Sequence, residues 1–144
     1  MSKMGLSYAA GLLSNIHIIL GLTNPTVNSY RRLVPHFEAP TSIAFSKRNR
    51  SAAVRIPMYY SGDEKSKRIR FRVPDPTCTP YLSFSALLVF GLDGVQKKLD
   101  PTKLGFGPFE ENIWENADIK QTPNNIFEIW ENLRRDKTLP NSGV

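Results

Sequence analysis

The sequence predicts an α+β fold in which antiparallel strands pack with helices. Three observations predict this class: an apolar helical stripe near the start, short strand-like segments in the middle, and two helical patterns after them. With 144 residues and a hydrophobic content of 40%, the chain can bury one core. We therefore expect one domain over residues 1–136, followed by a disordered tail over residues 137–144.

The first helix is predicted over residues 6–22. Its apolar residues recur at helical spacing and share one stripe, formed by Leu6, Ala9, Ala10, Leu13, Ile16 and Leu20. A signal peptide needs a cleaner apolar core than this one. Here Ser14 and Asn15 interrupt the apolar run. The segment is therefore interpreted as a packed helix, and Asn24-Pro25 is predicted to end it.

Three strands are predicted in the middle of the chain, over residues 42–46, 53–58 and 67–73. A polar turn of the hairpin kind at residues 61–65 separates the second strand from the third. Charged and apolar residues alternate along the third strand, and successive strand side chains point to opposite faces. One face carries Arg68, Arg70 and Arg72, while Ile69, Phe71 and Val73 are expected to enter the core.

Two more helices are predicted after the strands. Thr79 can cap the first of them with Pro80 at its first position, and this helix extends to about Leu99. Because residues 86–90 are apolar nearly all round, we expect this helix to be buried. The second is an amphipathic helix over residues 124–135.

Cations are concentrated between Arg31 and Arg72. Eleven of the 19 basic residues and three of the 13 acidic residues fall in this span, which gives it a charge of +8 and leaves −2 for the rest. Eight of the eleven are arginines, whose planar guanidinium suits bidentate binding of phosphate or carboxylate. The span therefore predicts an anion-binding face. The alternative is that residues 68–73 form an edge strand whose arginines are simply solvated. A second cationic segment at residues 50–55 favours the anion-binding face over this alternative.

Several motifs occur in a specific order and spacing. They are Asn24-Pro25-Thr26-Val27-Asn28-Ser29-Tyr30-Arg31-Arg32-Leu33-Val34-Pro35, Glu38-Ala39-Pro40, Ser46-Lys47-Arg48-Asn49-Arg50-Ser51-Ala52, Arg55-Ile56-Pro57, Pro74-Asp75-Pro76 and Pro80-Tyr81-Leu82. In these motifs the chain resembles the glutamine synthetase family, strongly from about Gly5 to Lys103 and more thinly to about Asp136. Family members are several-fold longer, so the resemblance is to one internal to C-terminal portion of the catalytic domain.

The resemblance implies an ATP-dependent ligase that joins ammonium to glutamate through γ-glutamyl phosphate, with Mg²⁺ or Mn²⁺. It implies that Glu38 is catalytic, as a general base on a mobile flap. It also implies that Arg32 and Arg72 bind glutamate. The residues that contact ATP and its phosphates would be Arg50, Arg55 and Arg68. For each arginine the alternative is a surface side chain with a local carboxylate partner, and for Glu38 it is a pair with Arg31 or Arg32.

The chain departs from the family pattern at the metal site. Arg70 stands where the family typically has a metal-binding glutamate, so metal binding is not expected at this position. The other family metal ligands come from upstream segments without a counterpart here, and catalysis by the isolated chain is therefore not expected. His17 and His36 share no metal-ligand spacing and are interpreted as structural. Trp114 stands near the place of a regulatory tyrosine in some members, so that regulation does not carry over.

Two further functions remain open. The first is a non-catalytic interaction protein, which forms a homo-oligomer or associates with a complementary or full-length synthetase chain. The second is a nucleic-acid-binding module built from the arginines and Tyr59 and Tyr60. It is less favoured, because Phe71 is predicted to point away from the arginine face and cannot stack a base beside it.

Two compositional features concern the cellular setting. Cys78 is the only cysteine, which excludes an intramolecular disulfide and indicates a reduced, cytoplasmic setting. The apolar run at residues 83–92 is shorter than the roughly 20 residues that a bilayer span requires, so no membrane association is predicted.

Overall fold

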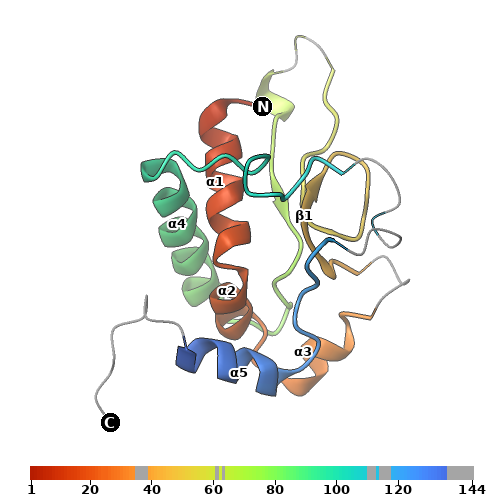
Figure 1. Ribbon diagram of the computed structural model, residues 1–144, viewed down its shortest axis with the longest axis vertical. Coiled ribbons are helices and arrows are strands. Elements are labelled where there is room, and N and C mark those ends of the chain that lie inside the picture. Colours follow the sequence, from red (N-terminus) through yellow and green to blue (C-terminus); the bar gives the residue numbers. More distant parts are fainter. Residues whose placement is uncertain (35–38, 61, 63, 110–112, 114–117, 136–144) are drawn as a thin grey trace.

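The structure is a computed structural model that describes residues 1–34, 39–60, 62, 64–109, 113 and 118–135 (Figure 1). Its elements are α1 (Lys3–Ser14), α2 (Ile16–Thr23), α3 (Val27–Arg31), β1 (Ser42–Ser46), β2 (Ala52–Arg55), the 3₁₀ turn η1 (Glu64–Ser66), β3 (Arg70–Phe71), α4 (Pro80–Gln96) and α5 (Ile126–Arg135). The predicted α+β class is confirmed. The expectations for His36, Glu38, Trp114 and the tail fall outside the described residues.

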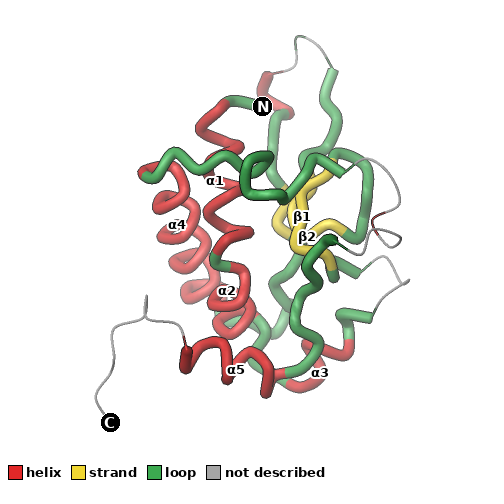
Figure 2. The backbone as a smooth tube through the Cα atoms, in the orientation of Figure 1, coloured by secondary structure: helices red, strands yellow, loops and turns green. Residues whose placement is uncertain are grey.

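The helices gather on one side of a small three-stranded sheet (Figure 2). The long helices α1 and α4 lie side by side, and α5 lies across the end of the molecule where it packs on α2. The main core fills the space between the sheet and helices α1, α2 and α5. Its buried members include Leu13, Leu20, Val54, Val73 and Ile129.

The single helix predicted over residues 6–22 is wrong in one respect, because α1 and α2 meet at a bend of 71°. Asn15 stands at the break with φ −108° and ψ 20°. Its side-chain Nδ2 donates to the carbonyl of Gly11 at 2.9 Å. The same carbonyl accepts the backbone N–H of Asn15 at 3.2 Å. An asparagine side chain that competes for a backbone carbonyl commonly bends a helix. The bend turns α1 toward α4 and α2 toward α5.

The sheet is mixed, whereas only antiparallel strands were predicted. β2 and β3 are antiparallel, but β1 and β2 run parallel, with Ser42 opposite Ala52 and Ser46 opposite Arg55. Parallel neighbours normally need a long crossover. Here residues 47–51 are sufficient, because they have to span only the length of the short strand β1, from its end at Ser46 back to the start of β2 at Ala52. The six Cα steps between these two residues can reach about 20 Å.

The third predicted strand is shorter than expected, since only Arg70–Phe71 pairs as a regular strand. The Arg72 N–H still donates to the carbonyl of Ala53 at 3.0 Å, so the segment follows β2 beyond β3. The predicted alternation is confirmed. Val73 is fully buried, and Ile69 and Phe71 pack against the main core. Arg68 and Arg70 are exposed, and Arg72 is half-buried.

Helix α4 begins with Thr79 in the N-cap position and Pro80 at its first residue, as predicted, although the Thr79 side chain makes no capping hydrogen bond. The expectation that this helix is buried all round is wrong. One face packs on α1, while the opposite face exposes a stripe of apolar side chains. The members of this α4 stripe are Tyr81, Leu82, Phe84, Leu88, Val89 and Leu92. The apolar pattern of a helix does not show whether each of its faces is covered in the folded chain.

The amphipathic helix predicted near the end is confirmed as α5, from Ile126 to Arg135. It buries Ile129 against α2 and leaves Phe127 and Trp130 exposed. The Arg134 guanidinium lies 4.3 Å from the centre of the Trp130 ring, a cation–π distance.

Among the described residues, no single helix is long and apolar enough to cross a membrane. Only the bent pair of α1 and α2 meets the length and composition of a span.

Candidate functional site

Two of the arginines singled out in the sequence lie on neighbouring strands. Arg55 on β2 is the direct cross-strand partner of Arg70 on β3. The Arg55 Nε donates to the carbonyl of Lys47 at 3.4 Å, which ties its side chain to the loop after β1. Like charges directly opposite each other destabilise a sheet unless an anion or water lies between them. Two of the predicted cations therefore lie opposite each other at this edge of the sheet.

Arg50 lies in the loop that connects β1 to β2. The buried hydroxyl of Ser46 accepts hydrogen bonds from the backbone N–H groups of Arg48 at 3.3 Å and Asn49 at 3.0 Å. The Asn49 side-chain oxygen then accepts the N–H of Ser51 at 2.9 Å. These three bonds hold the sharp return of the chain, in which Arg50 is exposed and lies two residues before β2 begins at Ala52.

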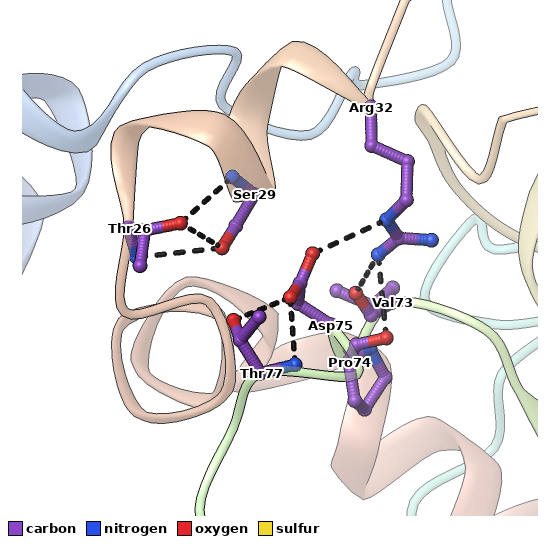
Figure 3. Close-up of polar contacts among 7 residues, drawn as sticks. All are labelled: Thr26, Ser29, Arg32, Val73, Pro74, Asp75 and Thr77. Carbon is purple, nitrogen blue, oxygen red and sulfur yellow. Dashed lines mark hydrogen bonds and ion pairs between the residues drawn. The ribbon is translucent and has the colours of Figure 1, made fainter.

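Arg32 follows α3 and reaches across to the segment after β3 (Figure 3). Its Nη2 donates to the carbonyl of Val73 at 2.6 Å and to that of Pro74 at 3.3 Å. Its Nε lies 3.7 Å from the Oδ2 of Asp75. Because Val73 directly follows Arg72, these contacts bring Arg32 beside the segment that carries Arg72. The segments that carry the two predicted glutamate-binding arginines therefore lie side by side, although the arginines are 40 positions apart in the sequence.

Asp75 is nearly buried and holds this junction together. Its Oδ1 accepts the Thr77 N–H at 2.9 Å and the Thr77 hydroxyl at 2.5 Å, and its own N–H donates to the carbonyl of Thr23 at 3.1 Å. The Thr77 hydrogen bonds, with the charge of Arg32 also contributing, hold the pKa of the Asp75 carboxyl below its usual range. Asp75 thus links the end of α2, the end of α3 and the turn before α4.

Helix α3 is short, and its first turn is fixed by a capping box. The Thr26 hydroxyl accepts the N–H of Ser29 at 3.2 Å, while the Ser29 hydroxyl accepts the N–H of Thr26 at 3.3 Å (Figure 3). A helix of five residues could not persist alone, and the capping box stabilises it. It thereby fixes the backbone position of Arg32, the residue that directly follows α3.

The sequence did not single out Asp75 or Thr77 as part of the site. The signal that could have found them is an aspartate followed two residues later by a threonine. Such a pair commonly closes a turn through side-chain to backbone hydrogen bonds. Of the other predicted residues, Arg68 precedes β3 and is exposed, and Glu38 lies outside the described residues.

Comparisons with known proteins place the chain in a family. A model described as the catalytic domain of glutamine synthetase matches residues 1–142. The chain belongs to this family. It is 44% identical over 143 residues to the glutamine synthetase of Sulfolobus acidocaldarius, which covers 94% of the chain and 29% of that relative. It is 42% identical over 142 residues to that of Methanococcus voltae, with 96% of the chain and 31% of the relative covered.

The synthetase of Microchaete diplosiphon is 44% identical over 151 residues, and that alignment covers 100% of the chain and 31% of the relative. The chain therefore spans about three tenths of the length of the glutamine synthetases that it matches. The family resemblance inferred from the motifs is confirmed.

Among the residues that the structure describes, the side chains do not fit a catalytic divalent ion. Within the described ranges, no three His, Cys, Asp or Glu side chains lie close enough together to hold a metal. His17 is half-buried within α2. Arg70 places a cation opposite Arg55, and both charges repel a divalent ion. No metal-dependent step is therefore derived from these residues.

One pocket of about 570 Å³ opens between the start of α1 and the ends of β1 and β2. Its lining is mainly apolar and includes Leu6, Phe45, Ile56 and Met58, with none of the predicted site residues among them.

Proposed function

We propose that this chain carries the anion-binding arginines of a glutamine synthetase catalytic site and does not make glutamine by itself. In this proposal Arg32 and Arg72 bind the carboxylate of glutamate. The ATP phosphates are bound by Arg50, Arg55 and Arg68, and Glu38 deprotonates ammonium. The observation that carries the proposal is the direct pairing of Arg55 with Arg70, which concentrates two cations on adjacent strands. The setting proposed for the chain is the cytoplasm, where ATP and glutamate are available.

Electrostatics supports anion binding at this edge more strongly than it supports catalysis. Cations placed opposite each other gain stability when a polyanion such as ATP neutralises them. Phosphoryl transfer needs metal ions that bridge the phosphates and neutralise the developing charge. The described residues provide the arginines but no metal ligand set, so we expect binding without turnover.

The test is calorimetric titration of the folded chain with ATP in the presence of a metal chelator. We expect binding that weakens as ionic strength rises, because charges at this exposed edge are screened by salt. Arg55→Gln should weaken binding about tenfold, the effect of losing one charge-assisted hydrogen bond. Lys97→Gln is the matched control, since it removes the same charge from the end of α4, where Lys97 pairs with Asp93. Equal losses in both variants would show attraction to net charge alone and contradict the proposal.

Turnover is tested separately, with ATP, glutamate, hydroxylamine and Mg²⁺ or Mn²⁺. No γ-glutamyl hydroxamate should form, whereas glutamate-dependent product that disappears in Glu38→Ala would show a complete catalytic site. An oligonucleotide titration in the same buffers tests the nucleic-acid alternative, whose affinity would fall steeply with salt.

A second candidate function is association with another chain. The α4 stripe supports it, with exposed fractions of 84% for Tyr81, 70% for Phe84 and 60% for Val89. Contiguous apolar surface of this kind commonly marks a protein–protein interface. The partners proposed are a second copy, or a complementary or full-length synthetase chain, because the chain spans only about 30% of its relatives.

Light scattering after size-exclusion chromatography tests this association, on the chain alone and mixed with a full-length glutamine synthetase. Leu88→Glu places a charge within the α4 stripe and should weaken association at least about tenfold. Val27→Glu is the control, because Val27 is exposed to a similar degree on α3. A chain that stays monomeric and binds no synthetase would rule out this candidate.

A further inference from the structure

We propose that Asp75 is a positioning residue for Arg32, and that Thr77 orients Asp75 for this task. The inference rests on the proposed function, in which Arg32 binds the carboxylate of glutamate. It adds two residues that do not themselves touch the substrate. What they determine is the direction in which the Arg32 guanidinium is presented.

Among the residues that the structure describes, the contacts of Arg32 leave one end of its guanidinium available. The Nη2 group donates to the carbonyls of Val73 and Pro74, and Nε faces Asp75. In Figure 3 the Nη1 end points away from Asp75. An arginine held in this way offers the N–H groups of Nη1 to a ligand and keeps its other N–H groups within the protein. The Arg32 side chain is 36% exposed, so a ligand in solvent can reach it.

Asp75 can impose this direction because its own carboxylate is fixed. Two hydrogen bonds from Thr77 hold Oδ1, and this leaves Oδ2 directed at the Arg32 Nε. The Asp75 backbone is tied as well, through its N–H to the carbonyl of Thr23. The Asp75 side chain is only 11% exposed, so water competes weakly for these bonds.

The benefit of this arrangement is preorganisation. A free arginine side chain loses about 2 kcal/mol of rotamer entropy when a ligand immobilises it, and an arginine already held loses less. A binding residue is held in productive geometry by neighbours whose own positions are fixed. Lysine cannot replace Arg32 here, because one ammonium group cannot contact two carbonyls and a carboxylate while also facing a ligand.

The test is NMR of the arginine Nε–Hε groups in the full chain, with the Arg32 signal assigned by its loss in Arg32→Lys. In the unmodified chain we expect this signal to be dispersed and slow to exchange with water. It should move to the position of a free arginine in Asp75→Asn and in Thr77→Val. In Thr77→Ser, which keeps the hydroxyl, it should stay dispersed.

If Asp75→Asn fails to fold, the comparison of Thr77→Val with Thr77→Ser decides the question. An Arg32 signal that is mobile in the unmodified chain, or unchanged in the variants that fold, would overturn the proposal.

Titration with L-glutamate then separates the positioning role from the proposed function. We expect glutamate to shift the Arg32 signal, with affinity about tenfold weaker in Thr77→Val and restored in Thr77→Ser. Equal affinity in Thr77→Val and the unmodified chain would overturn the positioning role. If the unmodified chain binds no glutamate, the role of Arg32 in the proposed function is wrong, and the Nε–Hε comparison still decides whether Asp75 holds Arg32.

Discussion

Replacing Gly11 with alanine is expected to destabilise the chain by about 3 kcal/mol, near the upper end of the cost of overpacking a core. A Cβ atom at this position would collide with the backbone carbonyl of Phe90 and lie 2.8 Å from the Cα of Gly94. Both obstacles are backbone atoms of α4, so no side-chain rotation can relieve the contact. The helices would have to move apart, and α1 and α4 form the most extensive contact between elements described in this structure.

Urea unfolding followed by circular dichroism measures this effect, and Gly5→Ala is the matched control in the same helix. A Cβ atom on Gly5 would meet the Ser2 Oγ at 3.4 Å, an ordinary contact, and the Met1 Sδ at 2.7 Å, and the methionine side chain can rotate away. Alanine is favoured over glycine in a helix by about 1 kcal/mol, so Gly5→Ala should be neutral or stabilising. A Gly11→Ala variant as stable as the unmodified chain would contradict the tight packing of α1 on α4.

The helical and strand patterns in the sequence predicted the elements well, because burial of one face leaves a periodic signal. The alternation through Ile69, Phe71 and Val73 and the apolar stripe of α1 are examples. Features decided by a few side-chain hydrogen bonds were missed. The break at Asn15 depends on its side-chain bond to Gly11. The parallel return from β1 to β2 depends on the Ser46 hydroxyl.

The candidate site divides in the same way. The polar turn predicted between the strands of Arg55 and Arg70 already suggested that these strands are neighbours, whereas the register that sets the two arginines opposite each other came from the fold. The junction of Arg32 with Asp75 joins residues 43 positions apart, and pairing over such a distance depends on the fold rather than on local pattern. The exposed stripe of α4 was also missed, because an apolar helix looks the same whether its partner is present or absent.

Acid is expected to destabilise the chain through Asp75. The Thr77 hydrogen bonds, together with the charge of Arg32, hold the pKa of this carboxyl below its ordinary value of 3.8 in the folded state. Unfolding releases the carboxylate from these partners, so the unfolded chain binds a proton at a higher pH than the folded chain does. The stabilisation is therefore complete above the unfolded pKa and is lost as pH falls through the folded pKa.

Comparison with Asp75→Asn isolates this contribution from the titration of other groups. Near neutral pH the variant should be less stable by about 2 kcal/mol, because the Thr77 hydrogen bonds no longer go to a charged acceptor and the ion pair with Arg32 is lost. The difference between the two proteins should stay constant down to about pH 5 and shrink below about pH 4. Thr77→Val should move the pKa of Asp75 upward, toward its ordinary value, in a carboxyl ¹³C titration. A stability difference that does not change between about pH 6 and pH 3 would mean that the charge of Asp75 does not hold the junction, and its contribution would then come from shape alone.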